Sequence, residues 1–134
     1  MTMPVNADYG HRKRVAIPFE TAVERVRESL KEQGFGVLCD IDVAGTISQK
    51  LGVDFGRKYV ILGACNPNLA YRALQAETEL GLLLPCNVIV YEDGDETVVS
   101  SIEPIAALGV VGNDALIDVA KTAGELLRAA VDAV

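Results

Sequence analysis

The chain has 134 residues, of which 50% are hydrophobic and 23% are charged, with a formal net charge of −7. This length fits a single domain, and the hydrophobic content excludes a disordered chain, which could not bury enough apolar surface to fold. A chain of this size buries roughly two-thirds of its surface, so it folds without disulfide or metal cross-links. The acidic balance argues against nucleic acid as a partner, because nucleic-acid affinity comes largely from Lys and Arg that neutralise phosphates.

The cysteine count and the apolar runs indicate a cytoplasmic protein. Three cysteines are too few for a disulfide framework, and an odd number cannot all form pairs, so we expect reduced thiols. The segment 1–14 contains no apolar core of a secretory signal. Every apolar run is far shorter than the roughly 20 residues that a membrane-spanning helix needs, so we expect no membrane association.

The first part of the chain has the pattern of a tail, a strand and a helix. We expect residues 1–11 to form a flexible polar tail and residues 12–134 to form one domain. Alternating residues predict a strand at 12–18, which Pro18 ends. Apolar residues at helical spacing then predict a helix at 20–33.

The rest of the domain alternates between strands and helices. Asn66 and Pro67 form a strong helix start, with Asn66 as the cap and Pro67 in the first turn. The turn Asp93–Asp95 joins the last two strands as a hairpin. The remaining elements are expected as strands at 36–43, 58–65, 86–92 and 97–103, a short crossover at 44–51, helices at 67–77 and 114–133, and a turn of helix at 104–111.

This order predicts an α+β fold, a two-layer sandwich with a mainly antiparallel sheet of about five strands and helices on one face. A sheet with one wet face alternates apolar and polar residues, but segments 60–64 and 88–90 are apolar on both faces. Another subunit, a ligand or the crossover at 44–51 must therefore cover the second face. We favour a homodimer, because symmetric association is common and requires no further molecule.

Two cysteines and their neighbours form the main candidate site. Cys65 ends a strand and precedes the helix start at Asn66, where a helix N-terminus can stabilise a thiolate. Cys86 begins the next strand, so antiparallel pairing of the two strands would bring Cys65 and Cys86 together at one rim of the sheet. With Asn66, Pro67 and Asn87 they would line a small pocket that holds a few fixed polar groups.

The same residues allow other interpretations. Cys65 and Cys86 could form a redox couple or hold a soft metal, although the single histidine, His11, makes a complete metal site hard to assemble in one subunit. A free cysteine also packs as a small buried hydrophobe, which is the interpretation that we favour for Cys39. We therefore predict a small dimeric ligand-binding protein. The alternatives are a thiol-dependent redox or metal-binding protein and a purely structural dimer.

Other polar groups point less clearly to a function. Asp40 and Asp42 share one face of a predicted strand and could hold a hard cation, but a solvated strand face explains them better. Backbone amides at Gly109–Asn113 could receive an anion, but a helix start accounts for this segment. The basic run His11–Arg14 could contact an anionic partner. The sequence contains no recognisable catalytic motif and identifies no cofactor.

Three segments resemble a known family, namely 35–43 (FGVLCDIDV), 61–74 (ILGACNPNLAYRAL) and 81–91 (GLLLPCNVIVY). They are similar to the bacterial and archaeal family catalogued as domain of unknown function 302, over nearly the whole chain. The resemblance implies a two-layer α/β fold with a curved antiparallel sheet, similar to the TATA-binding-protein architecture, and a dimer. It implies no established activity, and likeness of fold to a DNA binder assigns no function. The family's recognisable blocks map onto Cys65–Pro67 and Pro85–Asn87, which is the candidate site.

Overall fold

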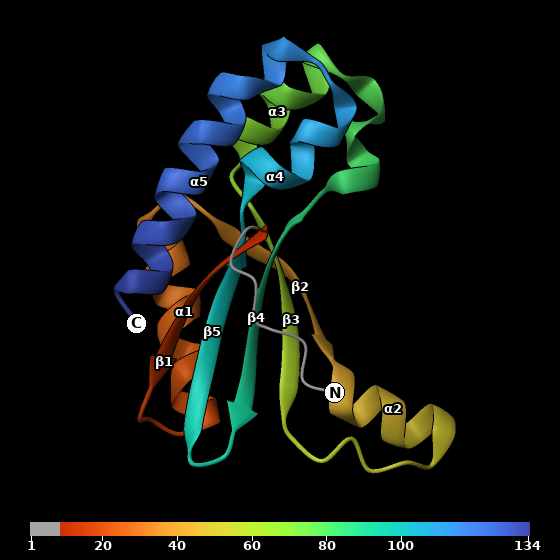
Figure 1. The fold of residues 1–134 in the computed structure, drawn as a ribbon, viewed down its shortest axis with the longest axis vertical. Helices are drawn as coiled ribbons and strands as arrows, with labels where there is room; N and C mark the ends of the chain where they lie inside the picture. Colours follow the sequence, from red (N-terminus) through yellow and green to blue (C-terminus); the bar gives the residue numbers. More distant parts are fainter. Residues whose placement is uncertain (1–8) are drawn as a thin grey trace.

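Five strands form one sheet in the computed structural model, which describes residues 9–134 (Figure 1). The strands are β1 (Gly10–Val15), β2 (Gly36–Asp42), β3 (Tyr59–Cys65), β4 (Cys86–Asp93) and β5 (Glu96–Ile102). The helices are α1 (Phe19–Glu32), α2 (Val43–Leu51), α3 (Pro67–Ala76), α4 (Pro104–Leu108) and α5 (Ile117–Asp132). Shorter 3-10 turns are η2 (Thr78–Leu83), η3 (Gly109–Val111) and η4 (Asp114–Leu116).

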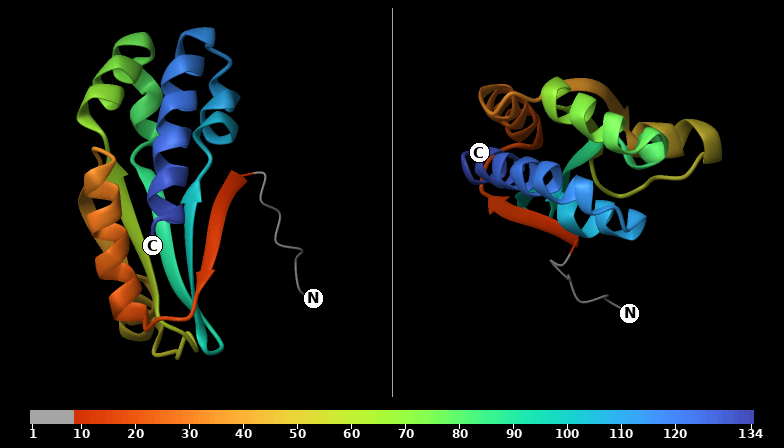
Figure 2. Two further views of the ribbon diagram at one scale, coloured as in Figure 1. Left: turned by 90° about the vertical axis from the view of Figure 1, so that its left-hand side faces the viewer. Right: turned by 90° about the horizontal axis from the view of Figure 1, so that it is seen from above.

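The sheet has the order β1-β5-β4-β3-β2, and every neighbouring pair of strands is antiparallel. It is curved, and α1 and α5 pack side by side against one of its faces (Figure 2). Helices α3 and α4 extend the helical layer beyond one end of the sheet (Figures 1 and 2). This arrangement confirms the predicted α+β fold of two layers with the helices on one face.

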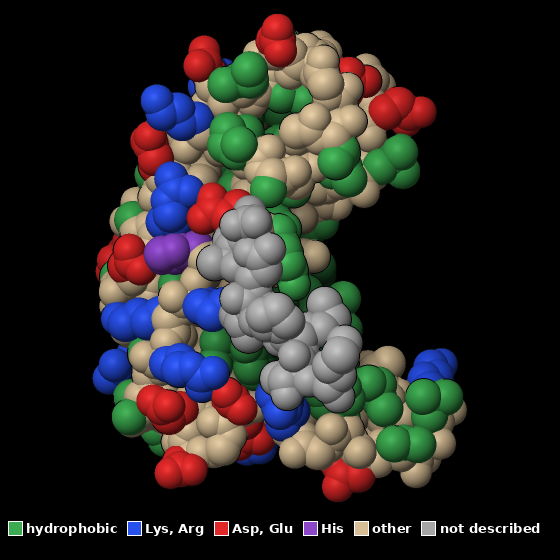
Figure 3. Space-filling model, viewed as in Figure 1, with side chains coloured by type: hydrophobic (Ala, Val, Ile, Leu, Met, Phe, Trp, Pro, Cys, Tyr) green, Lys and Arg blue, Asp and Glu red, His purple; other side chains and the backbone are tan. Residues whose placement is uncertain are grey.

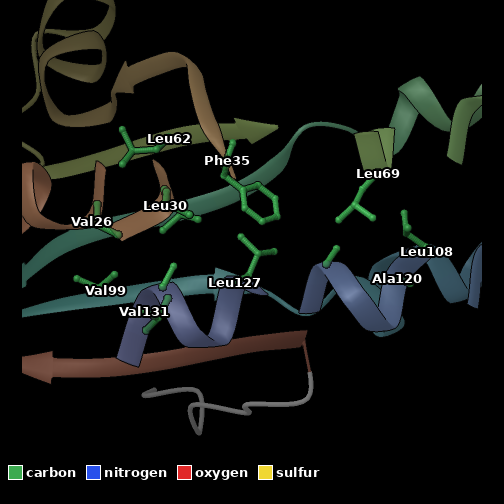
Figure 4. Packing of buried hydrophobic residues seen from close by; sticks show 14 of the residues in the cluster. Val26, Leu30, Phe35, Leu62, Leu69, Val99, Leu108, Ala120, Leu127 and Val131 are labelled. Carbon is green, nitrogen blue, oxygen red and sulfur yellow. The ribbon is translucent and has the colours of Figure 1, made fainter. Parts of the chain in front are cut away.

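The core lies between the sheet and the helices α1 and α5 (Figure 4). Val26 and Leu30 are four residues apart, so both point from the same side of α1 toward the sheet. Leu127 of α5 and Leu62 of β3 meet them, and all four side chains are fully buried. The predicted helical spacing thus marks the buried side of α1, as expected from the sequence.

The apolar residues of β3 and β4 divide between the two faces of the sheet. Leu62 and Val88 are paired across the strands and are fully buried beneath the helices. The adjacent pair, Ile61 and Ile89, points to the opposite face and is only partly buried. We call this side, which α1 and α5 do not cover, the open face.

Strand β1 begins at Gly10, two residues before the predicted strand, and residues 1–8 of the expected tail lie outside the described residues. Its basic residues bind the end of α5. The Nζ atom of Lys13 donates to the carbonyl oxygens of Asp132 and Val134, at 2.9 and 2.7 Å. His11 Nε2 lies 2.7 Å from a carboxylate oxygen of Asp132. Two members of the basic run therefore satisfy groups at a helix C-terminus, which cations favour.

The predicted short crossover at 44–51 forms a helix, α2. Asp42 caps it by accepting a hydrogen bond from the backbone amide of Gly45 at 2.9 Å. Gly52 ends it with a φ of 66°, a conformation that favours glycine. The helix contacts β2 and β3, but every one of its residues stays outside the core. Within 9–134, no helix is long and apolar enough to cross a membrane.

Candidate functional site

Cys65 and Cys86 lie at the same end of the sheet, as the sequence predicted. Strands β3 and β4 are antiparallel neighbours with Ala64 opposite Cys86, so the end of β3 meets the start of β4. Both thiols are free, both are partly buried, and both line one pocket of about 320 Å³. We call this space, bounded by the sheet end and by α3, η2, α4 and α5, the cysteine pocket.

The cysteine pocket has a buried floor and an exposed mouth. The buried residues of its lining include Phe35, Ala64, Leu69, Leu108, Val119 and Ala123. Phe35 follows α1 and Leu69 belongs to α3, and their side chains point toward each other (Figure 4). Leu38 and Leu74 are exposed at the mouth, at 70% and 39%. The pocket is thus an apolar space that opens to solvent at one side.

Asn66 is the polar side chain of the cysteine pocket. Its Oδ1 atom accepts a hydrogen bond from the backbone amide of Leu69 at 3.2 Å, so it caps α3 as predicted. Its Nδ2 atom lies beside Gly34, which has a φ of 85°. This packing fixes the amide against the loop after α1 and engages its oxygen with the helix. The pocket therefore offers a ligand few polar groups.

The structure does not bring all five predicted site residues together. Cys65, Asn66 and Cys86 share the cysteine pocket, whereas Pro67 is exposed in the first turn of α3 and is not part of the lining. Asn87 lies on the open face, opposite Gly63, because successive residues of a strand point to opposite faces of the sheet. Proximity of Asn87 to Cys86 along the chain therefore does not place both in one site.

Burial raises the pKa of Cys86 to about 11, and the neighbouring Cys65 thiol adds to the effect. Cys86 is therefore a neutral thiol at pH 7. A reactive or metal-binding cysteine needs the thiolate form. Within residues 9–134, no group of three or more His, Cys, Asp or Glu side chains could hold a metal ion. The pocket provides an apolar environment rather than an ionic one.

The prediction that Cys39 is a buried core residue is wrong, because Cys39 is exposed. The register of β2 against β3 shifts between Val37 and Cys39, so that Val37 faces Ala64 and Cys39 faces Gly63. Such a bulge adds one residue to the strand and reverses the faces that follow. Cys39 consequently moves to the open face, where its Sγ atom packs against Gly63.

Asp40 and Asp42 each have a structural role. Arg27 of α1 forms an ion pair with Asp40, with 2.5 Å between the guanidinium nitrogen and the carboxylate oxygen. Asp42 caps α2. The two carboxylates thus have separate partners. The strand face that we expected to be solvated contacts α1 through Asp40 and α2 through Asp42.

The second face of β3 and β4, which we expected a subunit, a ligand or the crossover to cover, holds a second space of about 550 Å³. Its lining includes the aromatic residues Tyr9, Phe55, Tyr59 and Tyr91 and the basic residues Arg12 and Arg57. We call this space the open-face hollow. Its residues come from β1 and the residue before it, from the loop before β3, and from strands β3, β4 and β5, so only the pairing of distant strands assembles it.

The fold and the cysteine pocket define a two-layer α+β protein with a five-stranded antiparallel sheet and an apolar space at one end. A family model for domain of unknown function 302 matches residues 11–134, and the chain belongs to that family. A crystal structure of an uncharacterized conserved protein of this family from Bacillus stearothermophilus is similar, with a TM-score of 0.88 and 33% sequence identity. The similarity covers 94% of this chain and 98% of that one. No curated protein sequence matches the chain.

Proposed function

We propose that this protein binds a small, uncharged apolar molecule in the cysteine pocket. The single observation that carries the proposal is the pocket itself, an apolar space of about 320 Å³ with a buried floor and an exposed mouth. Small-molecule sites in proteins are concave, mostly apolar and roughly 300–1,000 Å³ in volume. A ligand here would remove its own apolar surface and that of Leu38 and Leu74 at the mouth from water.

The lining also indicates the chemistry of the ligand. A charged group would lose its hydration without gaining a partner, because Asn66 already caps α3 and Cys86 is neutral. Apolar cavities of about 150 Å³ bind a single aromatic ring, and this pocket is larger. A ring system or a short acyl chain without charge therefore fits the site best.

Titration with the uncharged fluorescent probe N-phenyl-1-naphthylamine tests the proposal. Ala123→Leu places a larger side chain in the pocket, and we expect it to weaken binding of the probe at least tenfold. Ala129→Leu, on an exposed position of the same helix, is the matched control and should leave the affinity unchanged. Equal affinity for both variants contradicts the proposal. Leu74→Glu, at the exposed mouth and outside the proposed dimer surface, provides a second test that does not disturb the core and should also weaken binding of the probe.

A thiol reaction of Cys65 and Cys86 is the alternative, and their shared pocket is the observation that favours it. The raised pKa of Cys86 weighs against this alternative, because that thiol is protonated at neutral pH. Alkylation of Cys65 in a Cys39→Ser, Cys86→Ser variant, followed as a function of pH, tests it. An apparent pKa below about 7 for Cys65 would support the thiol chemistry, whereas a value of about 8.5 or higher would contradict it.

We also propose that the protein forms a homodimer through β2 and α2. Hydrophobic side chains gather over α2, whereas Lys and Arg side chains gather over β1 (Figure 3). Leu38 and Ile41 on β2 and Leu51 on α2 are all exposed. An edge strand with exposed apolar residues readily pairs with another chain, whereas charged residues protect an edge. Of the two sheet edges, β2 is therefore the one suited to a second copy.

Sedimentation equilibrium measures the oligomeric state directly. We expect a dimer for the unmodified protein and a monomer for the Ile41→Lys, Leu51→Lys double variant. Ile105→Lys, at a position on α4 with similar exposure to Ile41, is the control and should remain dimeric. A monomeric unmodified protein would contradict the homodimer. It would leave the proposal for the cysteine pocket untouched, since that pocket lies within one chain.

A further inference from the structure

The open-face hollow differs from the rest of this acidic protein in its charge. The chain has a formal net charge of −7, yet the hollow is lined by Arg12 and Arg57 and, within residues 9–134, by no Asp or Glu. The lining of the hollow thus carries two positively charged guanidinium groups and no carboxylate within residues 9–134. Its volume of about 550 Å³ is in the range of small-molecule sites.

Arg12 supplies a buried polar atom that lacks a partner. Its Nε atom is shielded from solvent and has no hydrogen-bond acceptor within residues 9–134. A terminal nitrogen of the same guanidinium lies 3.9 Å from the position that a Cβ atom on Gly10 would occupy. The side chain therefore folds back along β1 toward Gly10, which also lines the hollow. Within residues 9–134 the Arg12 guanidinium also forms no ion pair, so an anion at its terminal nitrogens would supply a partner for its charge.

Arg57 supplies the second positive charge and is only loosely paired. Among residues 9–134, its nearest carboxylate oxygen belongs to Asp93, at 4.0 Å. The other oxygen of Asp93 is engaged by Arg14 at 2.6 Å, so Arg14 neutralises most of that charge. The Arg57 guanidinium also lies 5.8 Å from the centre of the Tyr91 ring. Arg57 is thus held over the hollow by an aromatic ring while its donors remain available.

Aromatic rings form one wall of the open-face hollow. Tyr59 and Tyr91, which are opposite each other on β3 and β4, are stacked with 5.4 Å between ring centres and an angle of 11° between planes. Phe55 contacts Tyr59 edge-on at 5.9 Å. Flat apolar surfaces of this kind favour a planar ring in a ligand, because rings pack on each other by stacking or by edge contacts.

We infer that the open-face hollow binds a planar aromatic anion, with its ring against Tyr59 and Tyr91 and its carboxylate or phosphate at Arg12 and Arg57. Arginine suits this task, since its planar fork of donors matches the oxygens of both anions. This site is separate from the cysteine pocket, which opens on another side of the sheet and prefers an uncharged ligand. The inference therefore goes beyond the proposed function and does not depend on it.

Isothermal titration calorimetry with two probes tests the inference: 2-naphthoate as an aromatic carboxylate and adenosine 5′-monophosphate as an aromatic phosphate. We expect at least one of them to bind. Arg12→Gln and Arg57→Gln should each weaken that binding by about tenfold or more, as expected for a charge-assisted hydrogen bond. Arg25→Gln, on the exposed side of α1, is the matched control and should leave the affinity unchanged. The stronger probe identifies which anion the site prefers.

Further measurements separate the possible causes of binding. Cyclohexanecarboxylate and 2-naphthalenemethanol, which lack the planar ring and the charge respectively, should both bind at least tenfold more weakly than 2-naphthoate. Equal binding of cyclohexanecarboxylate would overturn the role of the aromatic wall. If single-stranded oligonucleotides bind with an affinity that rises with their length, the ligand of the hollow is nucleic acid, and the inference of a small aromatic anion is overturned. The Ala123→Leu variant should bind 2-naphthoate normally, so failure of this inference and failure of the cysteine-pocket proposal are distinguishable.

An absence of binding by both probes, or equal affinities for the Arg12, Arg57 and Arg25 variants, would overturn the inference. Because Arg57 lies in an exposed loop, Arg57→Gln remains informative if Arg12→Gln fails to fold. Binding should also weaken as salt rises from 0.05 to 0.5 M, roughly the range in which the Debye length falls from about 14 to 4 Å.

Discussion

The cysteine pocket and the open-face hollow share strands β3 and β4 but have opposite chemistry. Strand β4 contributes Cys86 to the pocket and Asn87, the very next residue, to the hollow. The helices close over the first side and bury it, which keeps the Cys86 thiol neutral. The second side stays open and carries two arginines and four aromatic residues. The polarity of each site therefore depends more on whether helices cover that face of the sheet than on the strands that the two sites share.

The two spaces nevertheless depend on one core, and the largest effect should come from damaging it. Leu127 of α5 is fully buried between the helices and the sheet. We expect Leu127→Ala to lower the free energy of unfolding by about 2–5 kcal/mol, because it removes packed methyl groups and leaves a cavity. Urea unfolding measures this loss. Leu82→Ala, at a position that is 82% exposed, should change stability by less than about 0.5 kcal/mol.

Adjacent substitutions on β4 compare the two sides of the sheet directly. Cys86→Ser introduces a hydroxyl group into the apolar pocket and should destabilise the protein by about 1–3 kcal/mol, the cost of burying an unpartnered polar group. Asn87→Ser, on the exposed side, should have an effect below about 0.5 kcal/mol. Urea unfolding of both variants checks the difference, and equal losses would show that the two sides do not differ in burial as described.

The pH dependence of stability reports on the same thiol. Burial raises the pKa of Cys86 from its usual value near 9.0 to about 11. Above pH 9 the unfolded chain releases this proton while the folded protein keeps it, so the contribution to stability falls as pH rises from about 9 to 11. We expect the unmodified protein to lose on the order of 2 kcal/mol more than Cys86→Ala across this window. Parallel pH–stability curves for the two proteins would contradict the burial of the thiol.

The smallest expected effect is at the aromatic wall of the open-face hollow. A double-mutant cycle with Tyr59→Leu and Tyr91→Leu isolates the energy of their stacking. We expect a coupling of about 0.5–1.5 kcal/mol beyond the apolar surface that leucine retains. Thermal unfolding of the four proteins in the cycle measures it. A coupling near zero would show that the two rings do not act as one surface.

Several local features could be read from the sequence because they depend on neighbours along the chain. Helical spacing marked α1, and Asn66 with Pro67 marked the start of α3. The meeting of Cys65 and Cys86 also followed, since antiparallel pairing of β3 and β4 brings the end of one strand to the start of the next. The sequence also showed that both faces of these strands are apolar. It did not show which of these residues the helices would cover.

Other features depended on contacts between distant segments. A bulge in β2 places Cys39 on the open face and not in the predicted core. The alternation of apolar and polar residues in the sequence does not show where a strand contains an added residue. The basic run of β1 found partners at the end of α5, more than a hundred residues away in the chain. The carboxylates of Asp40 and Asp42 separated in the same way, one to Arg27 of α1 and the other to the start of α2.

The sequence by itself determined the fold class, the amphipathic helices and the thiols at one rim of the sheet, because each follows from local spacing and from the pairing of successive strands. Only the tertiary structure decided that Asn87 and Cys86 line different spaces and that Arg12, Arg57 and four aromatic residues line the same hollow. The physical reason is that a strand sends neighbouring residues to opposite faces, while packing of helices and loops decides which of those faces is buried.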